Sequence, residues 1–225
     1  MQKFVDIVNP DIVAFDHYPT FGRNVADKRE TDTREDYVRN LDLACVIANK
    51  ASLPVWQFFN TVPYGGTHDD PTEAQLRWQI AVSVAYGVKG LLYFQWHPMT
   101  DGHPGLVMSK SDPGNVMPGP HFFVAKKLNS WVLAMAPTLL HATPLGVVNL
   151  RQDRDVDPAA VLANITCGTA GPLKNISAGD WVVGYFQIQA EPPALGSSTS
   201  TLDERVACGL GLGGLGGGTM MLSSG

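Results

Sequence analysis

The sequence predicts an α/β fold built on a parallel sheet. Three short apolar runs, each leading through polar residues into a segment with helical spacing, follow one another over residues 1–140. The runs are nearly continuous rather than alternating, which is typical of parallel strands covered on both faces. Strand and helix in regular alternation indicate right-handed βαβ units. Two architectures satisfy this pattern, a doubly wound sheet or part of a (β/α)₈ barrel.

The first unit is a strand within Asp11–Pro19 followed by a helix over Arg34–Ala51. The strand ends in polar and aromatic residues, and the helix carries apolar side chains at intervals of three to four residues. We expect this face of the helix to be buried. Its apolar stripe consists of Val38, Leu41, Cys45 and Ala48.

The second unit begins with a strand over Pro54–Phe59, and start and stop signals frame the helix after it. Asp70 can cap the helix, Pro71 suits the first helical position, and Glu73 completes a capping box. Gly87 is typical of a helix end. The acids of this loop are therefore attributed mainly to the helix start, which leaves Asp69 as the acid without such a role.

The third strand is expected over Gly90–Trp96, and a long loop then leads to a helix over 121–136. Beyond it the sequence becomes β-like at 145–150 and 179–190, with turn residues between the two runs. The last segment is rich in Ser, Thr and Gly, which predicts disorder. The predicted organisation is an α/β domain over 1–140, a small β domain over 141–191 and a low-complexity, Gly-rich tail over 192–225.

Composition excludes several classes of partner. The net charge of −5 gives no basic surface for nucleic acid, and no apolar run reaches the ~18 to 20 residues of a membrane span. The three cysteines show no metal-ligand spacing, and Cys45 is interpreted as a buried structural thiol. No cofactor is predicted either, because no strand precedes the Gly209-x-Gly211-x-x-Gly214 pattern. The first residues lack the features of a signal peptide, and localisation stays open.

Polar and aromatic side chains lie at the carboxyl ends of all three predicted strands. Because the carboxyl ends of parallel strands lie at one edge, and ligands bind there in both candidate architectures, three such sets in succession predict a binding site. Of the histidines outside these sets, His68, His121 and His141 are expected at the surface or at helix ends. The three sets are Asp16, His17 and Tyr18; Gln57 and Asn60; and Gln95, Trp96 and His97.

Together these strand ends resemble the later part of a family 42 glycoside hydrolase, a β-galactosidase-like group of (β/α)₈ barrel enzymes. "DIVAFDHYP" is similar to that family's Asp-x-x-x-x-Asp-x-Tyr-Pro strand, and "AYGVKGLLYFQW" to its Tyr-Phe-Gln-Trp strand. The similarity covers about Asp11–Leu140. It implies the last three βα units of a (β/α)₈ barrel, followed by a small β domain, and an activity on β-linked sugars such as galactosides.

The resemblance also implies roles for individual residues. Asp16 and Tyr18 match positions at the barrel mouth, and Trp96 matches an indole that can form an apolar platform for a sugar ring. Asp101 and His103 lie in a loop that the family places near the substrate. The implied substrate-binding set is His17, Tyr18, Gln57, Tyr64, Gln95, Trp96, His97, Asp101 and His103.

Two departures from the family concern catalysis. Counting back from Pro63 places Asn60 where the family keeps its nucleophilic glutamate, and an amide cannot form the glycosyl-enzyme ester. The family's Asn-Glu pair, which holds the general acid, is absent from this chain. Asp16 could act as a base on water instead. Gln57 and Asn60 could bind sugar hydroxyls, although Gln57 could equally satisfy backbone groups.

Three functions therefore stay open: a glycosidase, a non-catalytic carbohydrate-binding relative, and a structural module with a vestigial site. Three βα units cannot close an eight-stranded barrel, and closure is what removes exposed edges. We therefore expect the chain to be a fragment that lacks the half with the general acid and is inactive alone. The open edge also predicts marginal folding or self-association.

Overall fold

The computed structural model forms two compact units. The first comprises Met1–Ser83 and Val88–Ala134, and the second comprises Val84–Gly87 and Met135–Gly225. The residues that the structure describes are 1–19, 30–63, 65, 68–100, 102–108, 117–150, 181–188, 205–208 and 223–224.

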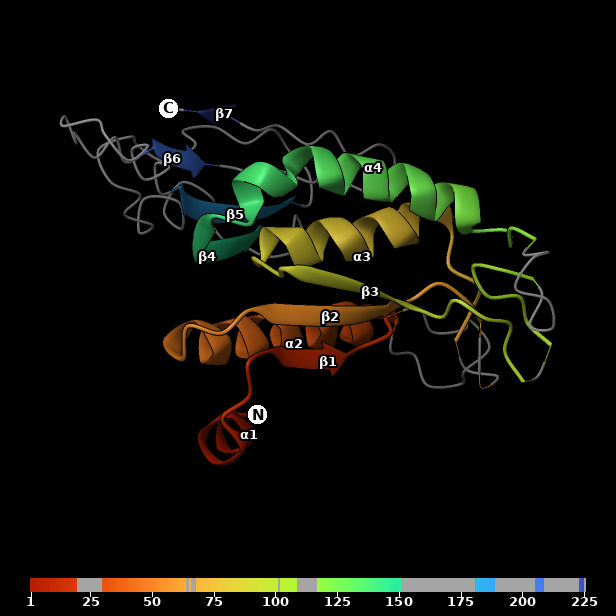
Figure 1. Cartoon of the computed structure of the whole chain (residues 1–225), viewed down its shortest axis with the longest axis horizontal. Helices are drawn as coiled ribbons and strands as arrows, with labels where there is room; N and C mark the ends of the chain where they lie inside the picture. Colours follow the sequence, from red (N-terminus) through yellow and green to blue (C-terminus); the bar gives the residue numbers. More distant parts are fainter. Residues whose placement is uncertain are drawn as a thin grey trace, which may run out of the picture. The chain divides into compact units, whose positions relative to one another are not determined.

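The first unit contains a parallel three-stranded sheet in the order β1-β2-β3 (Figure 1). Its strands are β1 (Val13–Asp16), β2 (Val55–Asn60) and β3 (Gly90–Phe94), joined by α2 (Glu30–Lys50) and α3 (Glu73–Ala85). The predicted strand–helix alternation and the parallel pairing are confirmed. Both a doubly wound sheet and a partial barrel contain such a sheet, so the partial barrel stays a prediction.

The two faces of this sheet differ in burial. On β2, Val55 and Phe59 are buried, whereas Trp56 between them is 37 % exposed, and Ala14 beside it on β1 is exposed as well. The apolar runs predicted strands covered on both faces, and this is wrong at Trp56 and Ala14. Sequential parallel strands with right-handed connections carry their helices on one face, which explains the difference.

Helix α2 packs against β2 through the predicted stripe, with one correction. Leu41, Cys45 and Ala48 are buried as expected, but Tyr37 is completely buried where Val38 was predicted. Burial raises the pKa of the Cys45 thiol to about 12, with a smaller effect of the Asp42 charge. The predicted burial of the Cys45 thiol is confirmed.

Two further helices belong to the described chain. A short helix, α1 (Gln2–Val8), precedes the sheet and ends at Asn9, which adopts the left-handed conformation that asparagine tolerates. Helix α4 (Phe122–Leu139) is the predicted helix after the long loop, and it continues past Pro137. No helix in the part of the chain that the structure describes is long and apolar enough to cross a membrane.

The second unit contains an antiparallel sheet in the order β4-β5-β6-β7. Strands β4 (Ala142–Leu150) and β5 (Trp181–Ile188) correspond to the two predicted β-like runs. Strands β6 (Arg205–Cys208) and β7 (Ser223–Ser224) lie within the segment predicted as a tail. The remaining tail residues, including the glycine pattern, lie outside the described residues. Gly87 has φ +83, consistent with its predicted place just beyond the end of α3.

Candidate functional site

The carboxyl ends of the three parallel strands meet at one edge of the first unit. In the sheet register Asp16 lies beside Phe58, and Asn60 lies beside Phe94. The residues that follow each strand therefore gather along this edge, as the sequence predicts for parallel strands. Of the predicted site residues, Tyr64 and Asp101 lie outside the described residues.

At the end of β1, an exposed carboxylate lies next to a tyrosine that hydrogen-bonds to it. The pKa of Tyr18 is raised to about 12, first by burial, then by the Asp16 charge and by the hydrogen bond to Asp16. The phenol therefore stays protonated near neutral pH and donates to the carboxylate. The Tyr18 ring also contacts Phe94, with centroids 5.1 Å apart, and His68 at 6.2 Å. These contacts join the ends of β1 and β3.

Gln57 is part of the sheet interior rather than of the binding edge. Its side chain is completely buried, and Nε2 donates to the carbonyl oxygens of Phe58 and His17, the latter at 3.4 Å. The predicted contact between Gln57 and a ligand is therefore not available in this structure. The alternative interpretation, that this amide satisfies backbone groups, describes what the structure shows. Its bond to His17 holds the end of β1 against β2.

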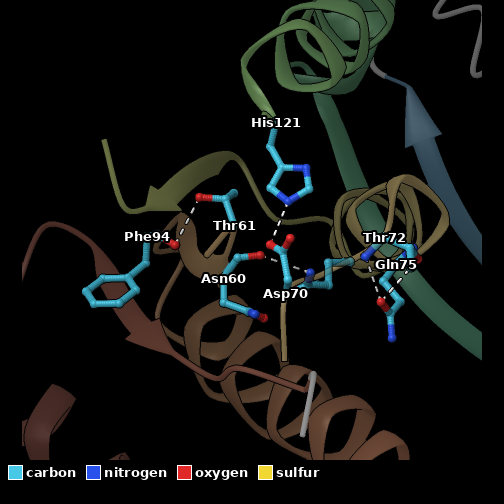
Figure 2. A network of polar contacts seen from close by, with 8 residues as sticks. Asn60, Thr61, Asp70, Thr72, Gln75, Phe94 and His121 are labelled. Carbon is cyan, nitrogen blue, oxygen red and sulfur yellow. Dashed lines mark hydrogen bonds and ion pairs between the residues drawn. The ribbon is translucent and has the colours of Figure 1, made fainter. Parts of the chain in front are cut away.

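The end of β2 is also tightly integrated with its surroundings. The Asn60 side chain is completely buried, and the Asn60 carbonyl accepts a hydrogen bond from Gln79 Nε2 at 3.3 Å. Thr61 donates both its backbone N–H, at 2.7 Å, and its hydroxyl, at 3.0 Å, to the Phe94 carbonyl (Figure 2). The amide at the position of the family nucleophile is therefore held inside the protein. A ligand reaches it only if neighbouring groups move.

The end of β3 provides the most accessible groups of the edge. Trp96 is 47 % exposed, and its ring contacts Phe122 at 6.3 Å between centroids. The segment that follows β3 also lines a pocket of about 480 Å³. Its lining is mainly apolar and includes residues with amide, imidazole and hydroxyl side chains, a combination that suits a small organic ligand. The pocket is lined by Gln95, His97, Pro98, Met99 and Thr100.

Backbone contacts hold this loop in place. Leu106 and Val107 donate their N–H groups to the carbonyls of Gln95 and Trp96 at 3.0 and 2.9 Å, and Met99 donates to the His103 carbonyl at 2.8 Å. The predicted site residue His103 therefore contributes to the loop through its backbone. The peptide bond between Phe94 and Gln95 is cis.

Gly105 allows the closest approach in this loop. A Cβ added to it would lie 2.2 Å from the His97 carbonyl oxygen and 2.5 Å from that of Trp96. Both distances are far below van der Waals contact, so a side chain does not fit without displacing the pocket backbone. The shape of the pocket wall therefore depends on this glycine.

The loop between β2 and α3 carries a helix cap that differs from the predicted one. Thr72 is the N-cap, because its hydroxyl accepts from the Gln75 N–H at 3.2 Å and Gln75 Oε1 accepts from the Thr72 N–H at 2.8 Å (Figure 2). This is a complete capping box. The prediction that Asp70 caps the helix and Glu73 closes the box is wrong. Asp70 with Glu73 and Thr72 with Gln75 have the same spacing of three residues. In the structure the helix is capped two residues later than predicted.

The two predicted capping acids contact basic side chains instead. Asp70 Oδ1 lies 2.8 Å from Nε2 of His121, which occupies the first position before α4 (Figure 2). Glu73 pairs with Arg77 at 2.9 Å and with Lys127 of α4 at 3.4 Å. The hydrogen bond from Arg77 has the largest effect in lowering the pKa of Glu73, and the charge of Lys127 lowers it further. These pairs tie the start of α3 to α4.

Of the other histidines, His141 is exposed, as expected, and His121 lies at a helix end. His68 is half-buried against Tyr18, so its expected place at the surface is only partly correct. Asp69 is exposed. Among the described residues, no group of three or more His, Cys, Asp or Glu side chains is arranged to hold a metal ion.

Sequence reasoning missed the residues behind His17. Asn40 Nδ2 lies 2.7 Å from His17 Nδ1, and the buried Tyr37 ring meets the imidazole edge-on at 5.4 Å. Tyr37 and Asn40 are three residues apart on α2 and therefore share a face. That spacing was visible in the sequence, but the contact of both residues with His17, which lies 20 or more positions earlier, was not.

Comparison with protein-family models, with curated proteins and with solved structures found no match to the chain. The similarity to family 42 glycoside hydrolases therefore rests on the strand-end motifs alone and stays a prediction.

Proposed function

We propose that this chain is glycoside-hydrolase-like and binds a β-linked sugar of the galactoside type at the edge formed by the carboxyl ends of β1, β2 and β3. On this proposal its first unit is the last part of a (β/α)₈ barrel. The observation that carries it is the exposed indole of Trp96 in the segment that also lines a pocket with amide, imidazole and hydroxyl side chains, on the same edge as the Asp16 carboxylate.

The groups of this edge suit a sugar for simple chemical reasons. A sugar ring has an apolar face and a rim of hydroxyl groups. Trp96 offers a flat apolar surface, while Gln95, His97 and Thr100 offer hydrogen-bonding groups in the adjoining pocket. Asp16 is a hydrogen-bond acceptor at this edge and already accepts one bond from Tyr18. A ligand hydroxyl can occupy its remaining acceptor positions.

A non-catalytic carbohydrate-binding protein is the second candidate. Hydrolysis of a glycosidic bond ordinarily uses two carboxylates flanking that bond. Asn60 occupies the position of the family nucleophile, and its side chain is completely buried. Among the described residues, the predicted site contains one carboxylate, that of Asp16. This favours binding without hydrolysis by the chain alone. In the glycosidase alternative, a further segment supplies the general acid and Asp16 acts on water.

A panel of aryl β-glycosides separates the two candidates. Both binding and release of the aryl group are measured for the wild type, Asp16→Asn and Trp96→Ala, with Asp11→Asn as the matched control. Asp11 is exposed and lies just before the opposite end of β1. We expect both site variants to weaken galactoside binding, and the control to leave it unchanged.

The outcomes discriminate clearly. Binding without cleavage supports the carbohydrate-binding protein and excludes the glycosidase for this chain. Cleavage that falls about 100-fold or more in Asp16→Asn identifies that residue as a general base, since such groups contribute about 10²–10⁴ in rate. Gain of cleavage in Asn60→Glu supports the match of that position with the family nucleophile. Absence of any sugar binding by the wild type refutes the proposal.

A further inference from the structure

The pocket after β3 has an apolar wall that a sugar ring alone does not use. Two of its lining residues, Pro98 and Met99, carry no strong hydrogen-bonding group on their side chains. The polar lining residues, which can bind sugar hydroxyls, are Gln95, His97 and Thr100. Pro98 and Met99 are therefore available to a second, apolar part of the ligand.

The backbone of these two residues adds to their apolar character. Pro98 has no N–H group, and the Met99 N–H donates to the His103 carbonyl at 2.8 Å. The Met99 carbonyl accepts from the Gly102 N–H at 3.1 Å. Neither Pro98 nor Met99 therefore has a backbone donor left for a ligand hydroxyl. A hydroxyl group placed against them would lose hydrogen bonds to water without replacing them.

The same backbone bonds fix the shape of the apolar wall. They close a turn from Met99 to His103, in which Gly102 has φ +91, a conformation that favours glycine. On the other side of Pro98, the His97 carbonyl packs so closely on Gly105 that a Cβ does not fit between them. A wall held at both ends is preorganised, which lowers the cost of binding a ligand.

The pocket also has room for more than one sugar ring. Its volume is about 480 Å³. Pockets of about 300–1,000 Å³ hold drug-sized ligands, which are larger than a monosaccharide. A glycoside can therefore place its sugar on the polar residues and its aglycone on the apolar wall.

We propose that Pro98 and Met99 bind the apolar aglycone of a β-galactoside, and that Met99 makes the chain prefer such ligands over galactosides with a minimal aglycone. This inference rests on the proposed function for the identity of the sugar. The apolar wall itself depends only on the pocket. Methionine suits the role, because its flexible thioether adapts to the outline of a bound group and makes favourable contacts with aromatic rings.

The affinities for methyl and phenyl β-galactoside, measured by isothermal titration calorimetry, test this preference. The two ligands share their sugar and differ only in the aglycone. We expect the wild type to bind the phenyl ligand about tenfold more tightly, as partial burial of an aromatic ring predicts. In Met99→Gln, which keeps the side-chain length but introduces an amide, the two affinities should become similar. Met108→Gln is the matched control, because it makes the same change at an exposed methionine outside the pocket lining, and it should keep the preference.

Carbon-13 NMR of the methionine methyl groups locates the aglycone. An aromatic ring shifts the resonance of a methyl group that packs against it. The Met99 signal is assigned from its loss in Met99→Leu. We expect phenyl β-galactoside to shift this signal strongly and methyl β-galactoside to shift it much less. The Met108 signal should not respond to either ligand.

Three results would overturn the inference. These are similar affinities of the wild type for the two galactosides, a preference for the phenyl ligand that persists in Met99→Gln, and a Met99 methyl signal that phenyl β-galactoside leaves unshifted. The wild-type affinities and spectra decide the first and third points even if Met99→Gln does not fold.

Phenol, the aglycone without the sugar, separates this inference from the proposed function. If the wild type bound neither galactoside but phenol shifted the Met99 methyl signal, the apolar wall would be supported and the proposed function alone refuted. If phenol left the signal unshifted as well, both would be refuted. Binding of methyl β-galactoside without a preference for the phenyl ligand would refute the role of Met99 and leave the proposed function in place.

Discussion

Replacing Gly105 with alanine is expected to displace His97, which lines the pocket after β3. The added Cβ would lie 2.2 Å from the His97 carbonyl oxygen and 2.5 Å from that of Trp96. An ordinary carbon–oxygen contact is about 1 Å longer, so the two backbone segments must separate by about that amount. Overpacking of this kind costs about 1–3 kcal/mol.

The separation should break the bonds that Leu106 and Val107 donate to Gln95 and Trp96. Amide hydrogen exchange measures their loss, because 1–3 kcal/mol corresponds to roughly 5- to 150-fold faster exchange of these N–H groups. A displacement of about 1 Å is also large enough to weaken ligand binding in the adjoining pocket. Exchange in the core of α3 should stay unchanged.

Gly146→Ala is the matched control, because a Cβ at that position meets no atom within 4 Å. We expect its exchange pattern in the pocket loop to equal that of the wild type. If Gly105→Ala and Gly146→Ala gave the same exchange rates at Leu106 and Val107, the close approach at Gly105 would be refuted as the feature that holds the loop.

Three further predictions concern stability. Tyr37→Phe removes a buried hydroxyl bonded to Ser83 and should lower the free energy of unfolding in urea by about 1 kcal/mol. Thr72→Ala removes the cap of α3 and should also cost about 1 kcal/mol, measured in the same way. The hydrogen bond from Arg77 lowers the pKa of Glu73 below its ordinary 4.5, so the ionised form stabilises the fold above that pH. The difference in Tm between the wild type and Glu73→Gln should therefore be present at neutral pH and disappear as the pH falls through the folded pKa.

Each of these predictions has a control. Tyr93→Phe removes a hydroxyl that donates to the exposed Asn129 side chain. A larger loss of unfolding free energy in Tyr93→Phe than in Tyr37→Phe would contradict the prediction for Tyr37. Asp70→Asn should lower the free energy of unfolding by less than Thr72→Ala does. The reverse order would indicate that Asp70, not Thr72, caps α3. If the Tm difference between the wild type and Glu73→Gln grew as the pH fell, it would contradict the predicted stabilisation by the ionised Glu73. Because Glu73 is exposed, that difference should also shrink at high salt.

Sequence patterns predicted the three strands and their helices because nearly continuous apolar runs and helical spacing are strong local signals. They failed where two local signals overlapped. In "DDPTEAQ", Asp70 with Glu73 and Thr72 with Gln75 both fit a capping box, and only the path of the chain selects one.

The candidate site was predicted less completely, because side-chain direction and long-range contacts decide it. Gln57 was placed at the rim by its position near a strand end, but the alternation of the strand directs it into the interior. Trp96 follows its strand and is exposed, as a residue beyond a strand end often is. The support of His17 by Asn40 depends on how α2 packs on the sheet, which no local pattern contains.

The most direct test of the proposed carbohydrate site is a two-dimensional NMR map of backbone amides during titration with methyl β-galactoside. The account predicts saturable shifts concentrated at residues 16–18 and 95–100, with little change at residues of α1 and β4. Absence of shifts, or saturable shifts centred away from the carboxyl ends of β1 and β3, would contradict it.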